Sequence, residues 1–68
     1  MKELLQEGDI LVFKSGTERK YTHLDKWMID NFYDDNLVCR TNDKFTVVEV
    51  LRPTYEVVFK RDVNKRIR

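Results

Sequence analysis

The chain has 68 residues, which is below the roughly 100 to 200 residues of an ordinary domain, so we expect one small core and no enclosed substrate cavity. Charged residues make up 37% of it and leave a net charge of +1, which does not mark a nucleic-acid or membrane binder. Cys39 is the only cysteine, so no disulfide can form within the chain, and without a signal-peptide pattern we expect the reducing cytoplasm. The apolar runs at 10–13 and 47–51 are far shorter than the roughly 20 residues that span a bilayer as a helix.

The charges are unevenly distributed along the chain. Residues 52–68 carry six Lys or Arg against two acids, a net of +4, whereas residues 1–51 have a net of −3. The chain therefore has a basic end and an acidic middle.

The first third of the chain predicts a helical turn and a hairpin. Residues 1–7 are too few for an independent helix but can form one turn. The β-branched and apolar run 10–14 predicts a strand, and Ser15 with Gly16 is typical of a two-residue hairpin turn. A second strand is expected over 17–24, in a register that sets Phe13 opposite Glu18, and its polar side chains indicate a sheet edge.

The middle of the chain is harder to assign. Residues 25–36 are dense in apolar side chains that fit neither a period of two nor a helical stripe, so a short strand and a helical turn capped by Asp30 both remain open. The run Asp34-Asp35-Asn36 predicts a turn, because these side chains bond readily to their own backbone. A brief strand over 37–40 and a second turn over 41–44 are expected to follow.

The clearest strand is predicted over 45–52. Both of its faces carry apolar residues, which is typical of a central strand, and Pro53 ends it because proline has no amide hydrogen for a ladder. Residues 55–60 alternate and predict a closing strand with Tyr55, Val57 and Phe59 facing inward. Residues 61–68 form a charged tail, either flexible or a short terminal helix.

These elements predict a mainly β fold in one small domain spanning residues 1–68. About five short strands joined by tight turns favour a small antiparallel SH3-like barrel or a curled sheet, with or without one short helix. The fallback is a three-stranded meander packed under a helix over 25–32.

Catalysis, metal binding and cofactor binding are not expected. No glycine-rich phosphate loop is present, and a nucleophile would have to be Cys39 or a serine working with His23 in a fold that gives little shelter from water. We expect Cys39 in the core and His23 at the surface. Asp34 and Asp35 lie together, but turn formation explains them better than a hard cation does.

Two stretches are candidates for binding. The acidic and aromatic stretch could form a partner surface, because aromatic anchors and an acidic rim suit a basic protein partner; its residues are Trp27, Asp30, Phe32, Tyr33, Asp34 and Asp35. Size alone favours Trp27 as a core residue, whereas Phe32 and Tyr33 are as readily exposed as buried. The basic end could instead contact nucleic-acid phosphates through Lys60, Arg61, Lys65, Arg66 and Arg68.

Three segments together give the sequence a resemblance. They are Gly8-Asp9-Ile10, Tyr33-Asp34-Asp35-Asn36-Leu37 and the run from Phe45 to Pro53. Over residues 8–60 the pattern resembles small uncharacterised proteins of phages and prophages of Gram-positive bacteria. The resemblance implies a phage-encoded accessory protein in a bacterial cytoplasm, a class in which very short proteins often bind and block a host protein, and it transfers no functional residue.

The sequence therefore predicts a non-enzymatic protein-binding module that modulates or inhibits a host protein, such as a defence or nucleic-acid-processing factor. One alternative is a small nucleic-acid-binding protein that uses the basic end. Another is a structural or self-assembling protein, in which copies pair edge to edge through residues 17–24 and form a homodimer or a larger assembly.

Overall fold

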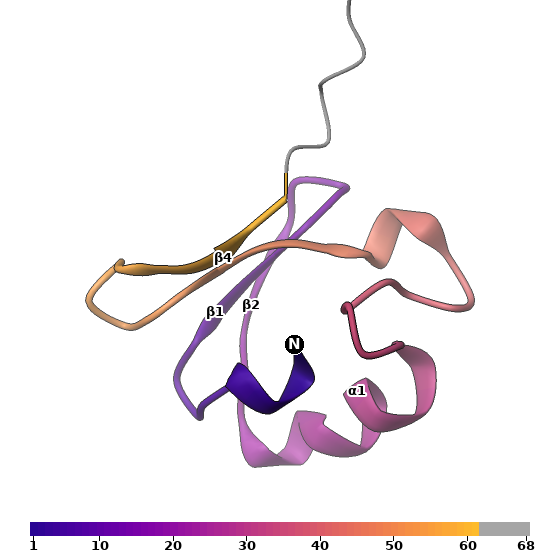
Figure 1. Cartoon of the computed structure of the whole chain (residues 1–68), viewed down its shortest axis with the longest axis horizontal. Coiled ribbons are helices and arrows are strands. Elements are labelled where there is room, and N and C mark those ends of the chain that lie inside the picture. Colours follow the sequence, from indigo (N-terminus) through magenta and orange to yellow (C-terminus); the bar gives the residue numbers. More distant parts are fainter. Residues whose placement is uncertain (62–68) are drawn as a thin grey trace, which may run out of the picture.

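A computed structural model of the chain describes residues 1–61, which fold into one four-stranded antiparallel sheet with short helices (Figure 1). The strand order is β2-β1-β3-β4. The elements in chain order are η1 (Lys2–Leu4), β1 (Ile10–Phe13), β2 (Glu18–Lys20), η2 (His23–Asp25), α1 (Lys26–Phe32), η3 (Asp43–Phe45), β3 (Val47–Leu51) and β4 (Val57–Lys60), where η denotes a 3-10 helix. No helix within the described range is long and apolar enough to cross a membrane.

The first hairpin has the predicted strands in a different register. Ile10 pairs with Lys20 and Val12 with Glu18, so the predicted pairing of Phe13 with Glu18 is wrong by one residue. The loop has three residues instead of two, because the Gly16 amide donates to the Phe13 carbonyl and the Phe13 amide donates to the Thr17 carbonyl. Gly16 has a φ of 96°, which closes this longer turn without a side-chain clash. β2 lies at the sheet edge, as predicted.

The central pair, β1 with β3, contains a bulge that decides which side chains face the core. Val12 pairs with Glu49 but Phe13 pairs with Val47, so Val48 is an extra residue on β3. The bulge puts Val47 and Val50 on the same buried face, three residues apart. The predicted alternation over 45–52 is therefore interrupted at Val48, although the central position of the strand is confirmed.

The second hairpin has a loop of the same design as the first. The Tyr55 amide donates to the Arg52 carbonyl, and the Arg52 amide donates to the Glu56 carbonyl. Tyr55 takes the place that Gly16 has in the first loop, with a φ of 70°. The prediction that Tyr55 and Val57 face inward is wrong, and both side chains are exposed. Tyr55 belongs to the turn, and the pairing with β3 shifts between Val57 and Phe59, so Val58 is an extra residue that interrupts the alternation of β4.

The stretch over 25–36 begins with helix α1, which ends at Phe32, and continues into a turn. Its cap differs from the predicted one: Asp25 and Thr22 form a capping box at the start of η2, in which the Thr22 amide donates to Asp25 Oδ2 at 3.0 Å, whereas Asp30 lies within α1. The brief strand expected over 37–40 is reduced to a single bridge between Tyr33 and Cys39.

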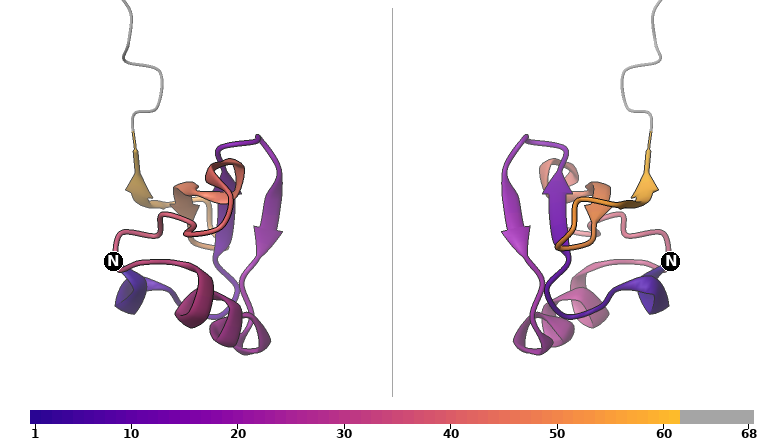
Figure 2. Two further views of the ribbon diagram at one scale, coloured as in Figure 1. Left: turned by 90° about the vertical axis from the view of Figure 1, so that its right-hand side faces the viewer. Right: turned by 90° about the vertical axis from the view of Figure 1, so that its left-hand side faces the viewer.

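The core lies between the sheet and the segment that connects β2 to β3. It contains Leu11, Phe13, Tyr21, Ile29, Tyr33, Leu37, Cys39, Val47 and Val50. Figure 2 shows α1 near the open end of the β1–β2 hairpin, where this segment turns back over the sheet. The fold is a curled, open sheet with one short helix, one of the arrangements that the sequence predicts.

Candidate functional site

Helix α1 has a buried side and an exposed side, and its packing decides which residues are available at the surface. Ile29 and Tyr33, four residues apart, enter the core. Trp27 lies two positions before Ile29, about 200° around the helix, and its side chain is 66% exposed. The expectation that size would put the only tryptophan in the core is therefore wrong.

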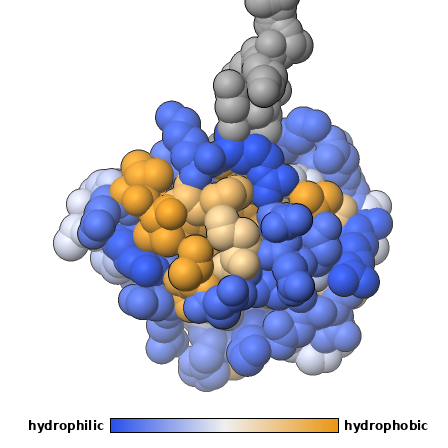
Figure 3. All heavy atoms as spheres, viewed as in Figure 1, coloured by the Kyte–Doolittle hydropathy of each residue, from blue (hydrophilic) through white to orange (hydrophobic). Residues whose placement is uncertain are grey.

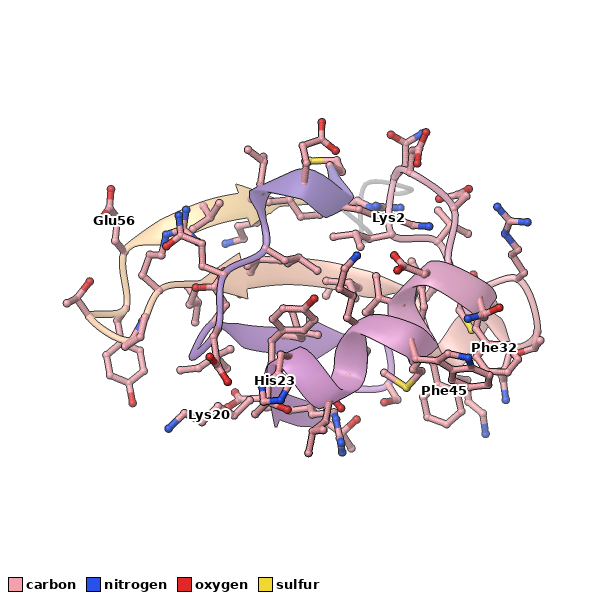
Figure 4. The ribbon with its side chains drawn as sticks, turned by 90° about the horizontal axis from the view of Figure 1, so that it is seen from below. Lys2, Lys20, His23, Phe32, Phe45 and Glu56 are labelled. Carbon is pink, nitrogen blue, oxygen red and sulfur yellow. The ribbon has the colours of Figure 1, made fainter. Side chains whose placement is uncertain are left out.

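Two aromatic pairs border the exposed side of α1. The rings of Trp27 and Phe32 meet edge to face, with centroids 5.6 Å apart. Phe45, at the end of η3, meets Phe13 in the same way at 6.3 Å. Phe32 and Phe45 are 37% and 46% exposed, and Figure 4 shows both on the same side of the molecule.

A groove separates the two aromatic pairs. Its volume is about 380 Å³, and Phe32 and Phe45 both line it. Its other lining residues are Phe13, Thr17, Glu18, Arg19, Met28, Tyr33, Cys39 and Thr41. We call the exposed rings of Trp27, Phe32 and Phe45, together with this groove, the aromatic surface. Sequence reasoning missed Phe13 and Phe45 as members, because both fall in predicted strands and only the fold brings them beside α1.

An ion pair anchors the polar edge of the groove. Arg19, from β2, donates to Asp25 Oδ1 through Nη2 at 2.7 Å and through Nε at 3.1 Å. Asp25 is 5% exposed, and its hydrogen bonds with Arg19 hold the pKa of the carboxyl below its usual value. The pair fixes the guanidinium on the groove wall and ties β2 to the start of α1.

The predicted acidic residues are mostly engaged within the protein. Asp30 is exposed but forms an ion pair with Lys26 at 3.0 Å. Asp34 Oδ1 accepts the amides of Asn36 and Val38, which lowers the pKa of the Asp34 carboxyl and confirms the predicted turn. Asp35 is exposed. The acidic rim expected for a basic partner is therefore much weaker than the sequence suggests.

Tyr33 belongs to the core instead of the surface. Its side chain is 3% exposed, and its hydroxyl donates to the Phe45 carbonyl at 2.7 Å. Burial raises the pKa of this hydroxyl to about 12, so it stays protonated and keeps that bond. Tyr33 supports the aromatic surface from below and offers a partner little contact.

The basic residues of the alternative site are only partly described. Lys60 is exposed at the end of β4. The Arg61 guanidinium donates to the Asn36 carbonyl and lies 5.2 Å from the centre of the Phe59 ring, so it already has partners within the fold. Lys65, Arg66 and Arg68 lie outside the described residues.

The two side chains considered for catalysis, Cys39 and His23, differ in exposure. Cys39 is buried and contacts Thr41 Oγ1 through its sulfur at 3.4 Å. His23 is exposed, and its Nδ1 lies 3.1 Å from Glu7 Oε2. Over residues 1–61, no group of three or more His, Cys, Asp or Glu side chains is arranged to hold a metal ion.

Comparisons of the chain with protein-family models, with curated proteins and with solved structures find no match.

Proposed function

We propose that this protein is a non-enzymatic binding module that docks a partner protein on the aromatic surface. The observation that carries the proposal is the exposure of three large aromatic rings: Phe32 and Phe45 line one groove, and Trp27 packs against Phe32. Trp27 is the most exposed of them, at 66%. A chain this small gains stability by burying its large side chains, so leaving its only tryptophan in water has an energetic cost that a partner can offset.

The shape and chemistry of the surface fit the anchor pattern of protein interfaces. Such interfaces concentrate binding energy in a few aromatic residues around a pocket, with polar groups at the rim. Phe13, which is buried, and Met28, which is half-buried, give the groove apolar lining, and the exposed Glu18 and Arg19 give it charged lining. A partner that inserts one apolar side chain into the groove and covers the indole of Trp27 matches this arrangement.

The charge pattern refines the expected partner. Asp30 and Asp34 are engaged by Lys26 and by backbone amides, so recognition by a basic partner contributes less than apolar contact. The proposed setting, a phage accessory protein that modulates or inhibits a host defence or nucleic-acid-processing protein, rests on the sequence resemblance alone.

The test combines capture with a site-specific readout. The tagged full chain is used to capture proteins from bacterial lysate, with and without nuclease, and the captured protein is then purified and titrated. Because Trp27 is the only tryptophan of the chain, partner binding should shift its emission to shorter wavelength. Where the partner contains tryptophan, the emission of the partner alone is subtracted. Trp27→Ser and Phe45→Ser should each weaken binding at least tenfold, measured by titration calorimetry because Trp27→Ser has no indole to follow.

The matched control is Leu4→Ser, because Leu4 is another exposed apolar residue, at 44%, and does not line the groove. It should leave the affinity within about twofold of the original protein. Unchanged affinity in both aromatic variants would remove the assignment of the site. Capture of nucleic acid alone, lost at high salt, would favour the basic end instead.

A further inference from the structure

The two edges of the sheet differ in the regularity of their pairing. β4 forms one edge, and its pairing with β3 shifts between Val57 and Phe59, so Val58 is a bulge residue. Figure 3 shows apolar side chains gathered on the face of the molecule that carries β4, but a bulge twists an edge strand and hinders its pairing with another chain. β2 forms the other edge and pairs with β1 over three successive residues without a shift. A further strand can therefore be added in regular register at β2.

The backbone of β2 presents hydrogen-bonding groups to this edge. Thr17 and Tyr21, at the two ends of the β1–β2 ladder, both bond to the backbone of the chain across from them. Because bonded pairs alternate along an antiparallel ladder, Arg19 is the bonded residue between them. Glu18 and Lys20 therefore direct their amides and carbonyls away from β1. No strand within residues 1–61 pairs there, so these four groups are available to a strand from another molecule.

The groove of the aromatic surface lies beside the same edge. Thr17 and Arg19 line it together with Phe45. Arg19 pairs with the buried Leu11, so Arg19 and Thr17, two residues apart, have their side chains on the core face of the sheet. Side chains of an added strand that lie opposite Thr17 and Arg19 share this face. The one opposite Thr17 then reaches the groove, whose volume of about 380 Å³ admits a large apolar side chain.

The charges of β2 specify the order of side chains in the added strand. Glu18 and Lys20 are exposed, and neither forms an ion pair within residues 1–61. Lys20 projects outward in Figure 4. Because opposite charges stabilise a strand pair, an antiparallel partner strand has an acidic residue opposite Lys20 and, two residues later, a basic residue opposite Glu18. Arg19 is already paired with Asp25, so the position between these two residues favours an apolar side chain that covers the aliphatic part of Arg19.

A second copy of this chain does not meet these requirements. An antiparallel pair of two β2 strands with Glu18 opposite Lys20 sets Arg19 opposite Arg19 of the other copy, and like charges directly opposite each other are unfavourable. The same register sets Tyr21 of the other copy opposite Thr17, but Tyr21 is buried in its own core. The groove would stay unfilled, so the edge fits a segment of a different protein.

From these observations we infer that the partner binds by strand addition: an extended segment of it pairs antiparallel with β2 and has the order acidic, apolar, basic, apolar, with the last side chain in the groove. The inference rests on the proposed function, to which it adds the backbone geometry and the chemistry of the partner segment. The charges of β2 oppose strands that lack this order, so they supply selectivity.

The experiment titrates a peptide with blocked ends, Thr-Thr-Glu-Val-Lys-Phe-Thr-Thr, into the full chain by calorimetry. We expect a dissociation constant of about 0.1 mM or lower. The Lys amide of the peptide donates to the Glu18 carbonyl in this register, whereas the Val amide points away from β2. Methylation of the Lys amide should therefore weaken binding at least tenfold, and methylation of the Val amide, the matched control, should change it by less than about threefold.

Variants of the chain test the charge order. The double variant Glu18→Lys/Lys20→Glu should bind the peptide about tenfold more weakly and should recover the affinity with the exchanged peptide Thr-Thr-Lys-Val-Glu-Phe-Thr-Thr. Both side chains are exposed, so the fold should tolerate the exchange. Glu56→Lys, near the other edge, is the control and should leave the affinity unchanged. Phe45→Ser should weaken binding about tenfold, because the groove loses one wall.

The outcomes separate this inference from the proposed function. Binding that is weakened by Phe45→Ser but equal for the two methylated peptides would leave docking on the aromatic surface in place and overturn strand addition. Absence of peptide binding at millimolar concentration, or failure of the exchanged peptide to restore affinity, would also overturn it. Binding that depends on the Lys amide but not on Phe45 would remove the groove from the inference and from the proposed function.

Discussion

Gly16 and Tyr55 occupy equivalent positions of the two hairpin loops, but only glycine adopts the backbone conformation there without strain. Gly16 and Tyr55 both have positive φ, at 96° and 70°. An L-residue with a side chain pays about 1–2 kcal/mol for the left-handed region, whereas glycine does not. The first loop is therefore relaxed and the second is strained at one residue.

This difference predicts opposite effects of two substitutions. Tyr55→Gly should raise the free energy of unfolding by about 0.5–1 kcal/mol, because relief of the strain exceeds the roughly 0.5–1 kcal/mol of extra chain entropy that glycine brings. Gly16→Ala should lower it by about 1 kcal/mol, although a Cβ there would meet no atom within 4 Å. Urea titration of both variants checks the pair, and a destabilised Tyr55→Gly protein would contradict it.

At the scale of elements, the junction between η2 and α1 depends on one carboxylate. Asp25 accepts from the Thr22 amide and from Arg19, and the Arg19 bonds are the main cause of its lowered pKa. Because the pKa in the fold lies below the unfolded value of about 3.9, the charged form stabilises the fold above about pH 4, and this stabilisation is lost as the pH falls through the folded pKa.

Asp25→Asn should therefore lower the free energy of unfolding by about 1 kcal/mol at pH 7 and flatten its decline between about pH 5 and pH 2. Thermal unfolding followed at several pH values measures both effects. Asp30→Asn is the control, because the exposed Asp30–Lys26 pair should contribute little. If the free energy of unfolding of Asp25→Asn fell with decreasing pH as steeply as that of the original protein, other carboxyls would be the cause of the decline.

The sequence predicts where the strands lie better than it predicts the register in which they pair. Local composition is enough to locate β1, the edge strand β2 and the central strand β3. It does not reveal the three-residue loop at Gly16 or the bulge at Val48, because each inserts one residue without altering the apolar pattern. Register and core face follow from these insertions, so they could not be predicted.

The candidate site was predictable only where it is continuous in sequence. Trp27 and Phe32 lie in the stretch that the aromatic content singled out, but a seven-residue helix has too few turns for its buried side to be read from periodicity. Phe45 joins them from η3 through tertiary packing. Tyr33 is buried in the core, where its hydroxyl donates to the Phe45 carbonyl, a partner that no local pattern indicates.

At the scale of the whole molecule, a buried ion pair ties the N-terminal segment to the end of β3. Asp9 is fully buried, and its Oδ2 accepts from Arg52 Nη1 at 2.7 Å and from the Gln6 amide at 2.9 Å. Arg52 also donates to the Leu4 carbonyl. The pair spans 43 positions of sequence, so it holds the segment before β1 against the residue that follows β3.

Removal of one partner should be much more harmful than removal of both. Arg52→Met leaves a buried carboxylate without its counter-charge and should cost about 3 kcal/mol of unfolding free energy. The double variant Asp9→Asn/Arg52→Met removes the charge as well and should cost less than half as much. Thermal unfolding of the single and double variants gives the comparison, and additive losses would mean that the two side chains act independently.

The strand order also has a consequence for how such a chain can diversify. The edge strand β2 and the central strand β3 lie at opposite ends of residues 21–46, the segment that holds α1, η3 and most of the groove. The entropy of closing such a segment changes only slowly with its length, so insertions at its exposed turns disturb the sheet little. The sheet can therefore stay constant as a frame while the surface residues of this one segment change, and a new binding specificity can evolve without a new fold.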